Sequence, residues 1–170
     1  MSLRLTSMIA AVLLLAACES TPTDTGMATT GGGAGGAGTS STQGPRPGTN
    51  EHLVATVGDR VFFDTDRSTV RPDGRATLDK QSAWLKQFPS TTVTVEGHAD
   101  ERGTREYNLA LGNRRATAAK NYLVATGVNP NRITTISYGK ERPAVVGSNE
   151  QAWSQNRRAV TVVTSSQPSS

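Results

Sequence analysis

The chain has 170 residues, with 18 Lys and Arg against 14 Asp and Glu and a net charge of +4, a length that favours one folded domain. Its basic residues are scattered among acids, aromatic residues are few and no nucleic-acid motif appears, so nucleic-acid binding is not predicted. Because only two histidines and one cysteine occur, the sequence predicts no intrachain disulfide, no metal site and no cofactor.

The first 17 residues have the order of a secretory signal peptide, with a positive charge at Arg4, an apolar run from Met8 to Leu15 and then two alanines. That run is too short to span a bilayer. Cys18 follows directly, and the sequence LAAC resembles the lipobox of bacterial lipoproteins, in which the cysteine carries the lipid. Glu19 is not the aspartate that typically retains such proteins in the inner membrane, so this resemblance implies a lipid anchor at Cys18 in the outer membrane, with the rest of the chain facing the periplasm.

Residues 18–50 consist mainly of Thr, Gly, Ser, Ala and Pro, with a glycine-rich run at 31–38. Such a composition lacks the large apolar side chains that a core requires. We predict a disordered linker of about 32 residues, with an r.m.s. span of roughly 30 Å and a full extension of about 110 Å. The folded domain is then expected at 51–165, followed by a frayed tail at 166–170.

The folded part begins with a β-rich segment at 57–63 and continues with alternating helices and strands. Pro72 opens a helix that stops at Phe88, with Trp84 and Phe88 in the core, and a strand covers 92–96. A longer helix begins after Thr104, a good N-cap, and ends before Gly127. A strand at 132–138, a helical turn at 149–154 and a strand at 159–164 follow. This order predicts an α+β fold, a two-layer α/β sandwich with its helices packed on one face of a small sheet (β-α-β-α-β with a final strand).

Two polar residues, Asn108 and Arg115, fall inside the apolar stripe of the long helix. A buried guanidinium is costly without a partner, and its long side chain leans back toward the loop that holds Asp100. Two interpretations are open: Arg115 and Asp100 pair and brace the loop, or they line a pocket for a zwitterion, whose carboxylate and ammonium they would bind. At about 100° per residue the stripe is formed by Tyr107, Leu111, Ala118, Ala119, Tyr122 and Leu123.

Ordered landmarks run through the chain from about residue 61 to 163. They include Phe62-Phe63-Asp64, Gly97-His98-Ala99-Asp100-Glu101-Arg102-Gly103, Tyr107-Asn108-Leu109-Ala110-Leu111, Arg115-Ala116 and Asn156-Arg157-Arg158-Ala159-Val160. The set resembles the OmpA-like peptidoglycan-binding domain, and within that family the peptidoglycan-associated lipoproteins. Many members have Thr in place of Ala99 and Ser in place of Gly112, and neither difference removes a charge.

This resemblance implies that the domain binds peptidoglycan noncovalently through meso-diaminopimelate of the peptide stem. Asp100 would take the ammonium group and Arg115 the carboxylate. The resemblance also implies that the protein tethers the outer membrane to the cell wall within the Tol-Pal system, with TolB as a partner, and supports envelope integrity and constriction at cell division. The residues that would complete the pocket are Asn108, Thr104, Leu111, Asp64 and Asp66.

A peptidoglycan-modifying enzyme is the alternative function. Asp100 and Glu101 could resemble a catalytic carboxylate pair, but neighbours on one loop do not flank a glycosidic bond from opposite sides. The sequence therefore favours a protein that is not an enzyme. His98 is predicted to be a structural residue of the loop, and residues 156–158 are left without a role.

Overall fold

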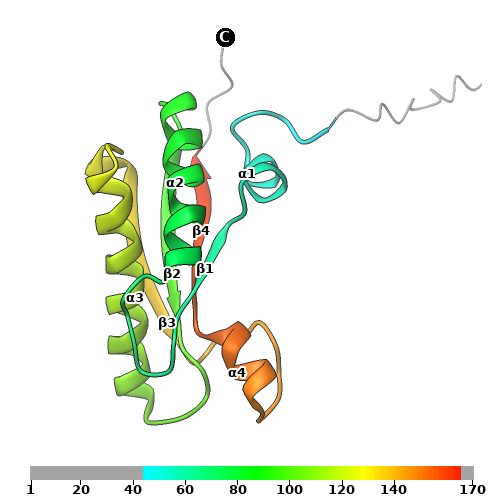
Figure 1. The fold of residues 1–170 in the computed structure, drawn as a ribbon, viewed down its shortest axis with the longest axis vertical. Coiled ribbons are helices and arrows are strands. Elements are labelled where there is room, and N and C mark those ends of the chain that lie inside the picture. Colours follow the sequence, from blue (N-terminus) through cyan, green and yellow to red (C-terminus); the bar gives the residue numbers. More distant parts are fainter. Residues whose placement is uncertain (1–43, 166–170) are drawn as a thin grey trace, which may run out of the picture. The chain divides into compact units, whose positions relative to one another are not determined.

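The computed structural model describes residues 44–165, which form a small sheet with helices packed against it (Figure 1). The expected signal peptide, Cys18, most of the linker and the tail lie outside the described residues. In chain order the elements are α1 (Asn50–Thr56), β1 (Arg60–Phe62), α2 (Pro72–Gln87), β2 (Thr92–His98), α3 (Arg105–Ala125), the 3-10 turn η1 (Pro130–Arg132), β3 (Ile133–Gly139), α4 (Glu150–Asn156) and β4 (Arg158–Ser165).

The four strands are arranged in the order β1-β4-β2-β3. β2 and β3 are parallel and are connected by α3, whereas β4 is antiparallel to both β1 and β2. The last strand therefore inserts between the first two, and β3 lies at an edge. The predicted α+β class and helix-covered sheet are confirmed, and the strand order, which the sequence pattern left open, is settled by these pairings.

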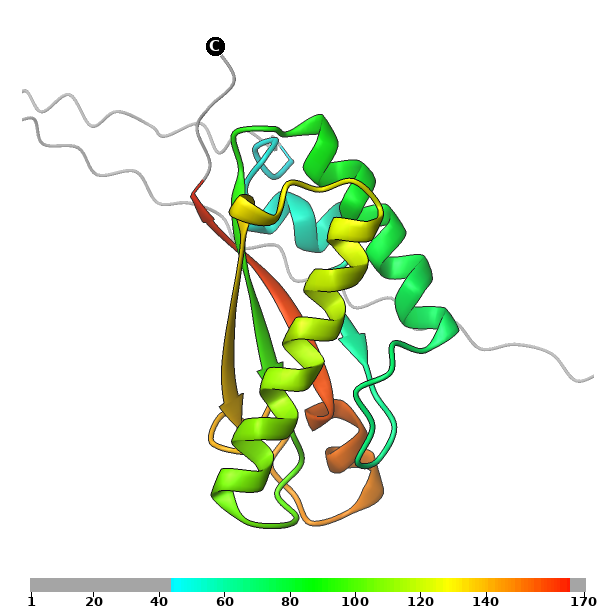
Figure 2. The same ribbon diagram turned by 90° about the vertical axis from the view of Figure 1, so that its left-hand side faces the viewer.

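Helices α2 and α3 lie side by side over one face of the sheet (Figure 2). Alternate residues of β2, Val93 and Val95, point into this interface and are buried, as the two-residue period of a strand requires. They belong to one apolar core with side chains of both helices. The core contributed by the helices includes Leu78, Trp84, Leu85, Ala116, Ala119 and Leu123.

The helix ends follow the predicted signals. Pro72 starts α2, the Thr104 hydroxyl accepts a hydrogen bond from the Tyr107 N–H at 3.2 Å, and Gly127 follows α3 with a φ of +98°. One part of the predicted stripe of α3 is wrong, because the Tyr107 side chain is exposed rather than buried. It belongs to the first turn, which extends beyond the edge of the core.

The short helix α1 was not predicted, and the first strand is shorter than expected. Thr49 caps α1 by accepting a hydrogen bond from His52 N–H. The ring of His52 in turn accepts a 2.9 Å hydrogen bond from the Trp84 indole, which ties α1 to α2. Gly58 has a φ of +85° and turns the chain, so the strand begins only at Arg60. A seven-residue helix with one buried residue, Leu53, carries too little periodicity to be recognised.

Helix α3 approaches β2 very closely where Gly112 faces Gly97. A Cβ atom on Gly97 would lie 1.8 Å from the Gly112 carbonyl oxygen, so no side chain fits there. On the helix side, a Cβ at Gly112 would lie 2.3 Å from Ser137 Oγ. Because both positions lack a side chain, the backbone of α3 can pack directly against the end of β2, next to the loop that carries Asp100.

Candidate functional site

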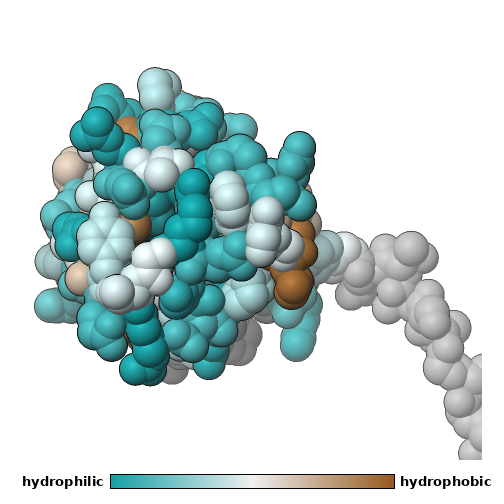
Figure 3. Space-filling model, turned by 90° about the horizontal axis from the view of Figure 1, so that it is seen from below, coloured by the Kyte–Doolittle hydropathy of each residue, from teal (hydrophilic) through white to brown (hydrophobic). Residues whose placement is uncertain are grey.

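Three loops and α4 gather at the lower end of the domain in Figure 1. They are the β1–α2 loop (residues 63–71), the β2–α3 loop (residues 99–104) and the β3–α4 loop (residues 140–149). Seen from this end, the surface is mostly hydrophilic, with small apolar areas among polar groups (Figure 3). The residues predicted to bind a ligand all belong to these loops or to the first three turns of α3.

Asp100 lies in the β2–α3 loop and is only 7% exposed. The guanidinium of Arg102 donates two charged hydrogen bonds to its carboxylate, from Nη2 to Oδ2 at 2.7 Å and from Nε to Oδ1 at 3.1 Å. The buried Arg157 approaches from the start of β4, with Nη1 at 3.4 Å from Oδ2. Burial by itself would raise the pKa of Asp100, but the hydrogen bonds from Arg102 and Arg157 outweigh it and the pKa is lowered. The carboxylate is therefore ionised at neutral pH.

Arg115 is completely buried, and its guanidinium is held by backbone carbonyl groups. It donates to His98 O at 2.8 Å, Arg67 O at 2.9 Å and Asp64 O at 3.1 Å. Both residues lie in the described part of the chain, and Arg115 forms no ion pair with Asp100 there. Burial lowers the pKa of Arg115 to about 10, against the opposing influence of the Asp100 charge. Arg115 therefore braces the β1–α2 loop against the end of β2, without the direct pair with Asp100 that one interpretation required.

The other predicted site residues differ from one another in burial and in hydrogen bonding. Asn108 is buried and its amide donates to Arg102 O at 2.7 Å and Thr104 O at 3.0 Å, so it shapes the loop around Asp100. Leu111 is buried, and Thr104 is exposed at the helix N-terminus. Asp64 and Asp66 are also exposed, and Asp66 has a φ of +55°. Asp64 contributes its carbonyl oxygen to Arg115, while its carboxylate is exposed and lies 3.6 Å from Arg71 Nη1.

The sequence pattern did not single out several residues that contact Asp100 or its partners. Arg157, which was left without a role, connects three segments: Nε donates to Phe63 O at 3.2 Å, Nη1 reaches Asp100 and Nη2 donates to Glu150 Oε1 at 2.5 Å. The guanidinium of Arg102 lies 4.2 Å from the ring centroid of Trp153 on α4. Three of these residues, Glu150, Trp153 and Arg157, are separated from Asp100 by about fifty residues of sequence, so no local spacing indicates them.

His98 ends β2 and is 2% exposed, which agrees with its predicted structural position. Both ring nitrogens lack a hydrogen-bond partner, and the nearest acid, Glu96, has its Oε2 3.5 Å from Nε2. Burial, reinforced by the charges of Arg158 and Arg142, lowers the pKa of His98 to about 4. The imidazole is therefore neutral at physiological pH.

Two further findings concern the described part of the chain. Between residues 44 and 165, no group of three or more His, Cys, Asp or Glu side chains is arranged to hold a metal ion. No helix in that range has the length and apolar character needed to cross a membrane.

Comparison with known proteins places these features in context. The model of the OmpA family matches residues 62–157. The chain is 59% identical over 117 residues to the peptidoglycan-associated lipoprotein of Rhizobium meliloti (strain 1021), an alignment that covers 69% of this chain and 66% of that protein. It is 50% identical over 155 residues to the protein of the same name from Mesorhizobium japonicum, covering 91% of this chain and 88% of the relative.

Solved structures agree with these sequence relatives. The crystal structure of the peptidoglycan-associated lipoprotein from Burkholderia pseudomallei matches with a TM-score of 0.62 and 39% identity, covering 66% of this chain and 93% of that one. The C-terminal domain of Helicobacter pylori MotB matches with a TM-score of 0.59 and 20% identity, covering 63% of this chain and 84% of that one. At that identity, the second match shows a shared fold only.

Proposed function

Because this chain belongs to the OmpA family, and within it to the peptidoglycan-associated lipoproteins, we propose that it binds peptidoglycan noncovalently through the zwitterionic end of meso-diaminopimelate in the peptide stem. The observation that carries the proposal is the buried carboxyl group of Asp100 at the loop end of the domain, with the buried guanidinium of Arg115 bonded to the carbonyl of His98, two residues before it. One fixed anion and one fixed cation complement the ammonium and the carboxylate of an amino-acid centre.

The ammonium group of the stem would bind to Asp100. In the structure Arg102 occupies the carboxylate oxygens and lies over the ring of Trp153, but its own side chain is 40% exposed, so its guanidinium can move into solvent. Arg157 is 6% exposed and is tied to Phe63 and Glu150, so it stays in place. We therefore infer that Arg102 is a displaceable cation, whereas Arg157 positions the carboxylate for the ligand.

The carboxylate of the stem would bind to Arg115. This side chain has five N–H groups, and backbone carbonyls accept from its Nε, Nη1 and Nη2 atoms. Two of those carbonyls, of Asp64 and Arg67, belong to exposed residues of the β1–α2 loop. A shift of that loop would release donors of Arg115 toward the ligand, while the buried His98 carbonyl keeps the guanidinium oriented. Asn108, Thr104, Leu111, Asp64 and Asp66 would form the surrounding walls.

The wider assignment follows from the family. We propose a lipid anchor on Cys18 in the outer membrane, a domain that faces the periplasm, and a tether to the cell wall that supports envelope integrity and constriction at division. TolB of the Tol-Pal system is the proposed protein partner. The proposal includes no catalysis, and incubation of the protein with purified wall should release no soluble fragments.

The experiment for the binding site compares Asp100→Asn with the native chain in cosedimentation with purified wall that contains diaminopimelate. The substitution retains the shape of the side chain and removes its charge, so wall binding should fall by at least roughly tenfold, equivalent to the 1.4 kcal/mol of one weak ionic contact. Asp79→Asn, on the middle of α2, is the matched control and should bind normally. If Asp100→Asn sediments with the wall like the native chain, the proposed site is wrong.

A further inference from the structure

The β3 strand forms one edge of the sheet. It is hydrogen-bonded to β2 on one side, and no other strand of the described residues pairs with its outer side. Its sequence from Ile133 to Gly139, ITTISYG, contains no charged residue and no proline. Sheet edges are normally protected by such residues, because alternate backbone N–H and C=O groups otherwise point outward and can pair with another strand.

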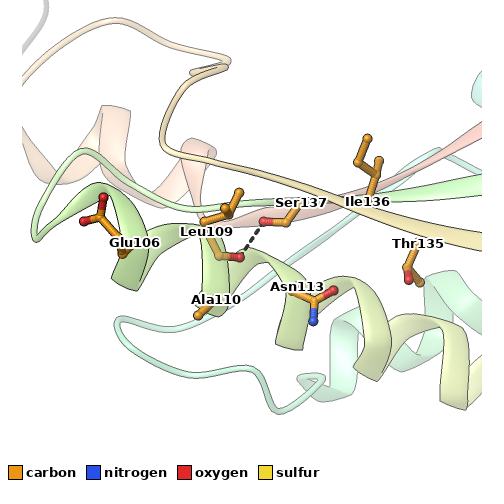
Figure 4. A pocket seen from close by; sticks show the side chains of 7 residues that line it. All are labelled: Glu106, Leu109, Ala110, Asn113, Thr135, Ile136 and Ser137. Atoms are coloured by element: carbon orange, nitrogen blue, oxygen red, sulfur yellow. Dashed lines mark hydrogen bonds between the residues drawn. The ribbon is translucent and has the colours of Figure 1, made fainter.

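A shallow apolar groove runs along this edge between β3 and α3. It has a volume of about 590 Å³, and Figure 4 shows its two sides, with the hydrogen bond from Ser137 Oγ to Leu109 O joining them at 2.7 Å. Two large apolar side chains on its rim are exposed, Leu109 by 43% and Ile136 by 40%. The lining residues are Glu106, Leu109, Ala110, Asn113, Thr135, Ile136 and Ser137.

The charges beside the groove are arranged symmetrically about Asn113. Glu106 lies seven residues before Asn113, near the start of α3, and Lys120 lies seven residues after it. Seven residues are about two helical turns, so the three side chains follow one stripe of the helix. Lys120 Nζ donates to Ile133 O at 2.7 Å, which places the ammonium group at the first residue of β3. An acid therefore lies at one end of the stripe and a base at the other.

This arrangement is complementary to itself, and we propose that the β3–α3 edge binds a second copy of the same chain. A two-fold axis beside Ile136 would pair the β3 strands in antiparallel fashion over Ile133–Gly139, with Ile136 opposite its counterpart. The same axis would place Glu106 of each copy opposite Lys120 of the other. Two four-stranded sheets would then form one continuous eight-stranded sheet with an isologous interface.

The spacing of the layers is compatible with such a pair. Helix α3 packs on both β2 and β3, and neighbouring strands are about 4.8 Å apart. Because α3 packs on both strands, its axis lies above the space between β2 and β3, about half a strand spacing inside β3. Pairing across the outer edge of β3 would therefore place the two α3 helices about two strand spacings apart, roughly 10 Å, at the upper end of the 8–10 Å range of packed helices. About the same axis, Leu109 of each copy would lie opposite Thr117 of the other, four residues on either side of Asn113, and these side chains would fill the groove.

The proposal is tested by disulfide cross-linking of the full chain in its native envelope. Opposed residues in an antiparallel pair have Cβ atoms about 4.5–5.5 Å apart, close to the reach of a disulfide. Ile136→Cys should therefore give a dimer of twice the chain mass after mild oxidation. Val54→Cys, an equally exposed valine on α1, is the matched control, and the native chain with its single Cys18 gives the background.

A charge reversal tests the orientation of the two copies. In the Ile136→Cys chain, Glu106→Lys should reduce the dimer because it opposes Lys120 of the other copy, and Lys120→Glu added to it should restore the dimer. A dimer yield from Ile136→Cys no higher than that of Val54→Cys would overturn the proposal, as would a cross-link to a protein of another mass. Ile136 is not one of the proposed wall-binding residues, so Ile136→Cys should bind the wall normally, which separates this test from that of the proposed function.

Discussion

Replacement of Arg115 by methionine is the most direct test of the brace seen in the structure. Methionine retains most of the apolar volume but removes three hydrogen bonds, to the carbonyls of His98, Arg67 and Asp64. The His98 carbonyl is buried behind the guanidinium and would remain without a partner, at a cost of roughly 1–3 kcal/mol. The other two carbonyls lie on an exposed loop and can bind water, so each loss costs roughly 1 kcal/mol.

These losses are partly offset because the variant no longer buries a charge. We expect the free energy of unfolding of Arg115→Met to fall by about 3 kcal/mol, and the melting temperature to fall by roughly 10 °C for a domain of this size. Urea and thermal unfolding followed by circular dichroism measure both quantities. Arg114→Met, an exposed arginine next to it on α3, should change stability by less than about 0.5 kcal/mol. Equal stability of the two variants would refute the brace.

Three further predictions use other parts of the molecule. Burial and neighbouring arginines lower the pKa of His98 from 6.5 to about 4, so the unfolded chain gains a proton first as pH falls. The contribution of His98 to stability should therefore decrease by about 2 kcal/mol from pH 7 to pH 5, and an unchanged pH dependence of urea unfolding in His98→Gln would contradict this. Arg102→Ala should bind the wall about fivefold more tightly, since Asp100 loses a competing cation worth about 1 kcal/mol; weaker sedimentation would show instead that Arg102 itself binds the wall. Gly97→Ala should lower the urea midpoint by the equivalent of about 2 kcal/mol through overpacking, whereas Gly44→Ala, with no atom within 4 Å, should not.

The sequence by itself determined the two long helices of this protein and its family. Pro72, Thr104 and Gly127 act on the backbone within one or two turns, so they specify the ends of α2 and α3 without reference to the rest of the fold. The apolar periods identify the buried faces for the same reason. They also indicated that Arg115 lies in the core, where a charged group must find partners.

Only the tertiary structure decided which partners these are. Arg115 meets carbonyls 17, 48 and 51 residues away, and Asp100 meets Arg157 across 57 residues. The strand order β1-β4-β2-β3 has the same origin, because β4 is the last strand and inserts between earlier ones. Contacts between distant segments depend on how the whole core closes, and neither periodicity nor capping carries that information. The edge position of β3, on which the proposed pairing depends, is also a property of the assembled sheet.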